Sequence, residues 1–421
     1  MPEADFFKME KQTVRLFTKS EKKILFFTGA GHFLAHSFIL IFPSIITPLA
    51  AELNLPFEDV IKISFLMYLF YGLGALPSGL LTDRLQPKIS LTIYFLGIGL
   101  AGFFIAFART QLQLKLTLMI LGIFLSIYHP AGIGLLSKSM KNRGLALGLN
   151  GIFGSIGIAS APFLAGTVNY FIGWRYIYRI LSIPSIALGI LLFSTGLYHQ
   201  ESDPISIKTE KEESSQKKIL PFIILCGSMS LAGLVYRGQT LLLPTYFERK
   251  INFLYNFVLT LDFFKGEGTK TLSATILTSF VYMISIFGQI MGGKIADKYE
   301  LRYAYLYFFL FSLPFLIMMY FLKDIPLLAA SIFFIMFSIG MQPVENSLIA
   351  KFTPHKWRNT SYGVKFTLTF GISSVVIYPI SFFQTRYDLS AVFLFFSLII
   401  GILVLNNFFL ILLTRGVSVR N

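Results

Sequence analysis

The chain has 421 residues, of which 55% are hydrophobic and only 14% are charged. A water-soluble domain carries about 25% charged residues. An apolar content this high cannot be hidden inside a globular core, so the composition argues against a soluble enzyme and indicates that lipid is the solvent. The formal charge of +15 lies mainly in short segments between apolar runs, a pattern typical of membrane proteins rather than of proteins that bind nucleic acid.

Apolar segments of about 20 residues, long enough to cross a bilayer as helices, follow one another along the chain. No signal peptide is expected, because the N-terminal stretch is polar and lacks a cleavage site. The segment after the seventh span, 248–270, is long and mixed in polarity, and a re-entrant or an interfacial helix both remain open. We expect twelve transmembrane helices near residues 24–50, 60–81, 89–108, 112–137, 144–170, 174–197, 220–247, 271–294, 302–322, 326–350, 360–383 and 389–414.

A polar segment rich in Lys, Glu and Ser separates the sixth span from the seventh. It is predicted to be a flexible linker over 199–219 between two halves, residues 1–198 and 220–421. Lys and Arg are about twice as frequent on the side of the membrane that would hold the termini and the linker. Both termini are therefore expected in the cytoplasm.

The two halves share an ordered series of residues. "GLLTDRLQPK" at 79–88 is echoed by "GGKIADKYE" at 292–300, with Gly and Asp four apart and a cation next in each copy. Internal repeats with a site at their interface are typical of transporters. Further residues pair at similar offsets, namely Pro43 with Pro244, Pro130 with Pro343, Arg143 with Arg358, Gly148 with Gly363, and Pro162 with Pro379.

The first of these loops resembles the signature loop of the major facilitator superfamily, Gly-x-x-x-Asp-Arg/Lys-x-Gly-Arg-Arg/Lys. Gln86 and Pro87 stand where the family has Gly and Arg, and the matching residues are Gly79, Asp83, Arg84 and Lys88. The stretch 128–166 is similar to the fosmidomycin-resistance-like branch, which includes proton-driven exporters. The resemblance implies an all-α integral membrane fold, with twelve transmembrane helices in two pseudo-symmetric six-helix bundles.

The repeated loops are predicted to gate the transporter. We expect Gly79 to let helices approach closely, and Asp83 to reach a helix N-terminus or a basic residue of the other half. The alternative is that the loop charges only set the topology. The resemblance implies a gating role for Gly79, Asp83, Arg84, Gly293, Asp297 and Lys298.

Polar residues at membrane depth are costly and usually functional. His32 and His36 lie one turn apart on the first span, so they share a face. Arg237 lies in the middle of the seventh span, and Asn150 and Asn346 are further candidates. The resemblance implies a central cavity between the halves, and the predicted substrate-binding residues are His36, His129, Arg237, Gln342, Glu345 and Lys365.

Such a cavity would carry positive fixed charge and suit a carboxylate or a phosphonate. Glu345, His36 or His129 would carry a coupling proton, because low dielectric raises the pKa of a carboxyl group and lowers that of a histidine, so that both could titrate near neutral pH. Purely structural roles are the alternatives. The histidines would then only pack and form hydrogen bonds, Arg237 and Lys365 would extend their charged ends toward the membrane surface, and Glu345 would neutralise one of these two cations.

The sequence thus predicts a secondary active transporter in a bacterial inner membrane, not an enzyme. Its expected cargo is a small anionic or amphipathic organic molecule moved with or against protons, export being slightly favoured. Import of an organic acid or a carboxylate-type chelate, and a non-transporting receptor or scaffold, are the alternatives. Protons and membrane lipid are the other expected partners, the chain is expected to be a monomer, and no cofactor or metal is expected, since phosphate-loop and metal-spaced Cys/His motifs are absent.

Overall fold

The computed structural model describes residues 17–195, 216–353, 358–415 and 419. Most of the predicted linker lies outside the described residues. Its last residues are helical, because the first helix of the second half already begins at Gln216.

The described residues of the first half form helices throughout. Several spans consist of consecutive pieces, and the piece η1 is a π-helix. In chain order the helices are α1 (Lys19–Ser44), α2 (Ile46–Leu53), α3 (Phe57–Ile63), α4 (Phe65–Leu73), α5 (Ala75–Arg84), α6 (Pro87–Ile105), α7 (Gln111–Leu125), η1 (His129–Ile133), α8 (Gly134–Ser139), α9 (Arg143–Ile172) and α10 (Arg175–Ser194).

The second half is built in the same way, and its span eleven also contains a π-helix, η4. The external segment 248–270 forms the end of one long helix followed by two short ones. The helices are α11 (Gln216–Lys250), α12 (Phe253–Val258), η2 (Asp262–Phe264), α13 (Thr269–Lys298), α14 (Leu301–Phe321), α15 (Asp324–Gly340), α16 (Gln342–Phe352), α17 (Arg358–Phe366), η4 (Thr367–Gly371), η5 (Ile372–Val376), α18 (Ile377–Arg386) and α19 (Ala391–Leu413).

Twelve helical stretches of the described chain are long and apolar enough to cross a membrane. This confirms the expected twelve spans, whose ends differ from the predictions by a few residues. Proline explains several irregularities, because its ring removes a backbone donor and clashes with the preceding turn. Pro130 begins the π-helical turn of span four, and Pro343 follows the break between α15 and α16 in span ten.

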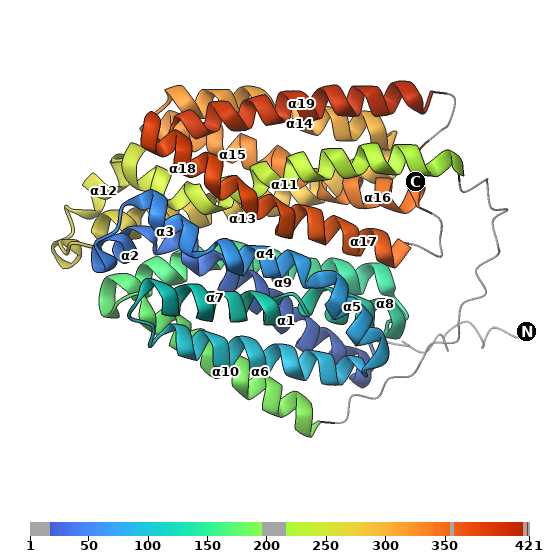
Figure 1. The fold of residues 1–421 in the computed structure, drawn as a ribbon, viewed down its shortest axis with the longest axis horizontal. Helices are drawn as coiled ribbons and strands as arrows, with labels where there is room; N and C mark the ends of the chain where they lie inside the picture. Colours follow the sequence, from blue (N-terminus) through green and yellow to red (C-terminus); the bar gives the residue numbers. More distant parts are fainter. Residues whose placement is uncertain (1–16, 196–215, 354–357, 416–418, 420–421) are drawn as a thin grey trace, which may run out of the picture.

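The helices of the two halves lie on either side of a common interface. In Figure 1, the blue and green helices up to α10 occupy the lower part of the molecule, and α11 to α19 occupy the upper part. Across the interface α9 packs along α13, and α1 packs against α11. A residue on α1 or α11 that faces inward is therefore close to both halves.

The halves also meet at the end of the molecule where α2, α3 and α12 lie in Figure 1, opposite the start of α1 and the end of α19. The Glu248 carboxylate at the end of α11 accepts a hydrogen bond of 2.7 Å from Thr47 of the first half. It accepts a second of 2.8 Å from Thr271 of its own half. A partly buried polar contact thus joins the two halves at this end.

A glycine on span two permits a very close approach of the halves, but it is not the expected one. A Cβ atom on Gly72 would lie 1.9 Å from the backbone nitrogen of Gly371. A Cβ atom on Gly79 would meet only Pro130, at the ordinary contact distance of 3.6 Å. The close approach of the halves is thus found at Gly72, whereas the contact at Gly79 is an ordinary one within the first half.

Candidate functional site

Three imidazole rings gather inside the first half. His32 and His36 project from one face of α1, and His129 reaches them from the π-helix η1. The ring centroids of His32 and His36 lie 4.9 Å apart, and those of His129 lie 5.4 Å and 5.8 Å from them. His36 and His129 are buried and His32 is half-buried. We call these three residues the histidine cluster.

Aromatic residues of the second half cover this cluster. The ring of Phe366 stacks on His129 with centroids 4.8 Å apart, and Phe370 follows at 6.0 Å. Phe370 also stacks on Tyr71 of the first half at 5.1 Å, and the Tyr71 hydroxyl lies 2.9 Å from Nε2 of His129. Phe366 and Phe370, here called the aromatic bridge, therefore tie span eleven to the histidine cluster.

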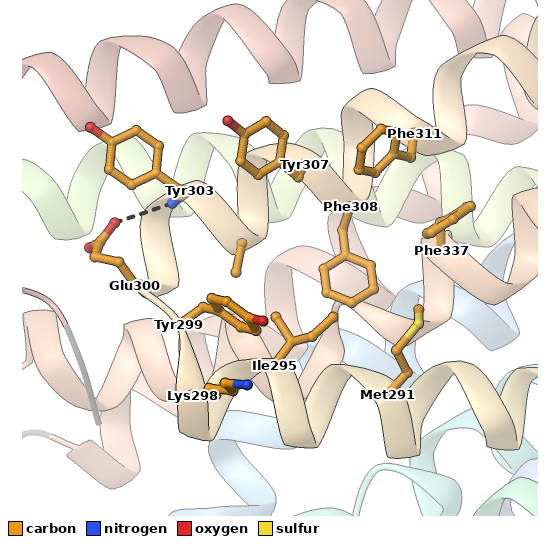
Figure 2. A pocket seen from close by; sticks show the side chains of 11 residues that line it. Met291, Ile295, Lys298, Tyr299, Glu300, Tyr303, Tyr307, Phe308, Phe311 and Phe337 are labelled. Carbon is orange, nitrogen blue, oxygen red and sulfur yellow. Dashed lines mark hydrogen bonds between the residues drawn. The ribbon is translucent and has the colours of Figure 1, made fainter.

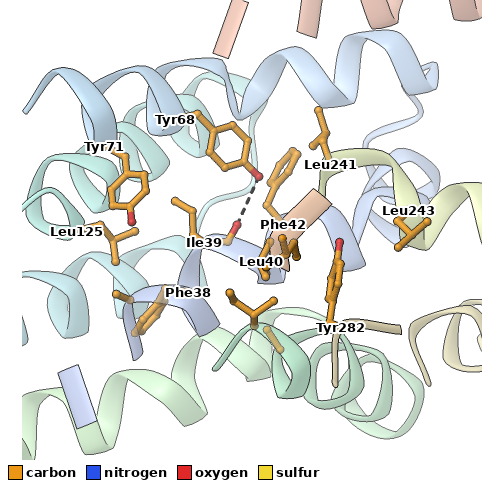
Figure 3. Packing of buried hydrophobic residues seen from close by; sticks show 14 of the residues in the cluster. Phe38, Ile39, Leu40, Phe42, Tyr68, Tyr71, Leu125, Leu241, Leu243 and Tyr282 are labelled. Atoms are coloured by element: carbon orange, nitrogen blue, oxygen red, sulfur yellow. Dashed lines mark hydrogen bonds between the residues drawn. The ribbon is translucent and has the colours of Figure 1, made fainter. Parts of the chain in front are cut away.

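Arg237 lies deep in the molecule, near Phe370 of the aromatic bridge. Its side chain is 2% exposed, and its guanidinium carbon lies 3.9 Å from the ring centroid of Tyr68 and 6.0 Å from that of Phe370. Figure 3 shows Tyr68 and Tyr71 on the same helix, with the Tyr68 hydroxyl directed at the backbone oxygen of Ile39.

Within the described part of the chain, no carboxylate forms an ion pair with Arg237, and its Nε atom has no hydrogen-bond partner. A buried charge without a counter-charge is costly, and cation–π contacts with Tyr68 offset only part of that cost. An arginine that cannot deprotonate and has no acidic partner is suited to an anion supplied from outside the protein.

Glu345 and Lys365 form a buried ion pair within the second half. The Lys365 Nζ atom lies 2.8 Å from Oε1 of Glu345 and donates to the side-chain oxygen of Asn346 at 2.6 Å. The Tyr305 hydroxyl donates to the other carboxylate oxygen at 2.6 Å. The sequence left open whether Glu345 neutralises Arg237 or Lys365, and in the structure it pairs with Lys365. Arg237 therefore has no carboxylate partner among the described residues.

The predicted substrate residues thus fall into three groups around span eleven. Lys365 directly precedes Phe366, so the ion pair lies beside the aromatic bridge, which contacts both Arg237 and the histidine cluster. Gln342 is half-buried at the start of α16, without a hydrogen bond to the described residues. Sequence reasoning missed Tyr68, Tyr71 and the aromatic bridge, because 16% of the chain is aromatic and single rings do not stand out.

The predicted gating residues lie in the last two turns of α5 and of α13. Arg84 ends α5 and is exposed, and Asp297 and Lys298 are exposed in the last turn of α13. A Cβ atom on Gly293 would meet nothing within 4 Å. The side chain of Asp83 lies outside the described residues, and its gating role stays a prediction.

A separate groove of about 690 Å³ runs along the second half between α13, α14 and α15. Figure 2 shows that it is lined mainly by aromatic and aliphatic side chains, with Lys298 and Glu300 at one end. Tyr303, Tyr307 and Phe311 of its wall are exposed on the outside of the bundle. None of the predicted substrate residues lines this groove, which is an apolar surface of the kind that faces lipid.

Comparisons with known proteins identify a family and several distant relatives. Residues 25–377 match the family described as Major Facilitator Superfamily. The uncharacterized MFS-type transporter YfnC of Bacillus subtilis (strain 168) is 23% identical over 317 residues, which cover 73% of each chain. The nitrite extrusion protein of the same organism is 22% identical over 61% of this chain and 60% of that one. A probable hexose phosphate transport protein of Chlamydia trachomatis is 22% identical over 63% and 61%.

Solved structures share the fold across nearly the full length. A bacterial homolog of the human lysosomal transporter Spinster, inward-facing and unoccupied, has a TM-score of 0.71 at 14% identity, covering 95% of this chain and 98% of that one. The peptide transporter POT in complex with alafosfalin has a TM-score of 0.71 at 13% identity, covering 95% and 96%. At these identities the likeness defines the fold alone.

Proposed function

The chain belongs to the major facilitator superfamily, and from this premise we propose that it carries a small organic anion across the membrane by alternating access. Membership makes it a multi-pass membrane transporter of a small molecule rather than an enzyme. The two halves would rock around a site near the bilayer midplane. That site comprises Arg237, the aromatic bridge and the residues adjoining it.

The observation that carries this proposal is the buried charge of Arg237, which has no acidic partner among the described residues. A carboxylate, phosphate or phosphonate would supply the missing counter-charge and accept charge-assisted hydrogen bonds from the guanidinium. The names of two relatives, a nitrite extrusion protein and a probable hexose phosphate transport protein, are consistent with anionic cargo. Tyr68 and Phe370 support an amphipathic cargo, because their rings would pack against its apolar part.

Proton coupling is the second element of the proposal. Glu345 is 2% exposed, accepts a hydrogen bond from Tyr305 and pairs with Lys365. A proton arriving on this carboxylate would break the ion pair and release Lys365 on span eleven, next to Phe366. Protonation would in this way be linked to the aromatic bridge between the halves. His36 and His129 are the other candidate proton carriers.

Direction and location complete the proposal. The likeness of 128–166 to the fosmidomycin-resistance-like branch favours export, while import of an organic acid or a carboxylate-type chelate is the rival within the class. A non-transporting receptor is the rival from another class. We place the chain in a bacterial inner membrane as a monomer with both termini in the cytoplasm, as the distribution of Lys and Arg predicts.

A ligand-dependent thermal shift of the purified protein tests the binding site. Hexose phosphates, nitrite and a panel of small carboxylates and phosphonates would be screened, because a ligand that binds only the folded state raises its melting temperature. The variant Arg237→Gln should lose the shift produced by the best anion. Arg386→Gln, which removes an exposed cation from the end of α18, is the matched control and should keep it. A shift that survives in Arg237→Gln contradicts the assignment.

A further inference from the structure

The histidine cluster brings one ring nitrogen from each of its three residues close together. The ligand-capable nitrogens of His32, His36 and His129 all lie within 4.8 Å of one another. Nε2 of His36 is 3.2 Å from Nε2 of His32. Nδ1 of His129 is buried and has no hydrogen-bond partner, and the residue itself is 7% exposed.

Partners on the far side of two rings fix their orientation. Nδ1 of His32 donates to the backbone oxygen of Asn150 at 2.8 Å, so Nε2 of that ring accepts the hydrogen bond from Nε2 of His36. A metal ion would take this lone pair in place of the shared proton. The Tyr71 hydroxyl contacts Nε2 of His129, which leaves Nδ1 as the nitrogen of that ring without a hydrogen-bond partner. Histidines that ligate metals are usually held in this manner, with the other ring nitrogen bound to a carbonyl or another polar group.

The spacing of one pair of nitrogens also agrees with a coordination sphere. Nitrogen ligands lie about 2.0–2.1 Å from zinc, so two of them in a tetrahedral site are about 3.3 Å apart. The contact between His32 and His36 already has this length. The pair is offered by one helix face at i and i+4, and the third ligand comes from a π-helical turn, a feature frequent at functional sites.

The geometry points to a binding site for a divalent transition metal ion, of the class of Zn²⁺, formed by His32, His36 and His129. Three imidazoles suit zinc, copper, nickel and iron rather than calcium or magnesium. Three protein ligands leave a fourth position of a tetrahedral ion open for water or another small ligand. The sequence concealed the site, because only two of the three histidines are neighbours on one helix.

Nearby cations determine how the site would behave. Lys365 is neutralised by Glu345, but Arg237 has no counter-charge among the described residues and repels a metal ion. The metal should therefore bind more tightly when an anion is also present. Replacing Arg237 by Gln should strengthen binding of the metal alone, while it removes the proposed anion site.

The test is titration of tag-free, detergent-purified protein with Co²⁺, whose visible absorption reports tetrahedral nitrogen coordination, followed by competition with Zn²⁺. We expect one ion per chain and lost or much weaker absorption in His36→Asn and His129→Asn. Tyr71→Phe, which removes an outer-shell contact, should weaken binding about 10–100-fold. His199→Ala, a histidine of the linker, is the matched control and should bind like the parent chain.

The melting temperature of each variant without metal checks that the variant is folded. Zn²⁺ should raise the melting temperature of the parent chain but not that of the histidine variants. Two results overturn the proposal. One is a folded parent chain that shows no tetrahedral Co²⁺ absorption. The other is absorption that persists in both histidine variants. Because Arg237→Gln should lose anion binding and keep Co²⁺ binding, failure of this site and failure of the proposed transport site are distinguishable.

Discussion

Two buried cations of this chain sit in opposite electrostatic situations. Lys365 has a carboxylate at 2.8 Å, whereas Arg237 has the faces of Tyr68 and Phe370 and no acid among the described residues. The sequence predicted the depth of both, because each interrupts an apolar span. The sequence left open which of the two cations pairs with Glu345, because that depends on how α16 packs against α17 and α14.

The ion pair can be tested by removing one charge and then both. Glu345→Gln leaves the Lys365 ammonium buried without a counter-charge, and we expect a loss of about 3 kcal/mol of stability. The double variant Glu345→Gln/Lys365→Met should regain most of it, because no unpaired charge remains. The melting temperature of the purified single variant should therefore lie below that of the double variant. Equal melting of the single and double variants would show that the two groups do not depend on each other.

At the scale of the helix, irregularities follow the prolines and glycines that the sequence displays. The His129–Pro130 and Gln342–Pro343 dipeptides both lie where a span changes its helical form. The sequence could not show which glycine mediates the close contact of span two. Gly72 and Gly79 look alike in sequence, and only the packing of span two against span eleven distinguishes them.

The close contact of Gly72 with Gly371 predicts a severe effect of a single methyl group. Gly72→Ala would force α4 away from η4, and overpacking of this kind costs about 1–3 kcal/mol. Gly401→Ala, on α19 with nothing within 4 Å of the new methyl group, is the matched control and should leave melting and transport unchanged. A Gly72→Ala variant that melts and transports like the parent chain would show that the halves need not approach so closely.

A surface ion pair outside the spans gives a pH-dependent prediction. Arg175, with help from Trp174, holds the pKa of the Glu52 carboxyl below its ordinary value of 4.5, although partial burial opposes this. The pair joins α2 to the start of α10. A lowered folded-state pKa means that this stability is present above pH 4.5 and is lost as the pH falls through the folded-state value.

The variant Glu52→Gln should accordingly melt slightly below the parent chain at pH 7, the effect being small because the pair is partly exposed. The difference between the two should shrink as the pH is lowered below about 4.5. Melting curves over this range provide the measurement. A difference that grows toward acid pH would contradict the role given to the pair.

At the scale of the whole molecule, the sequence predicted twelve spans and a twofold repeat because both depend on patterns along the chain. It did not predict the aromatic bridge, because Phe366 and Phe370 acquire their role only when span eleven meets spans two and four of the other half. The polar contact between Glu248 and Thr47 is hidden for the same reason. Interfaces between the halves are thus the part of the site that sequence patterns do not encode.

The central claim is that the charge of Arg237 binds the cargo between the two halves. The most direct measurement is flux of a radiolabelled anion, chosen from the thermal-shift screen, in proteoliposomes that carry a pH gradient. The parent chain and Arg386→Gln should move the anion, and Arg237→Gln should move it no faster than empty liposomes while melting as a folded protein. Undiminished, gradient-driven flux through Arg237→Gln would contradict the account.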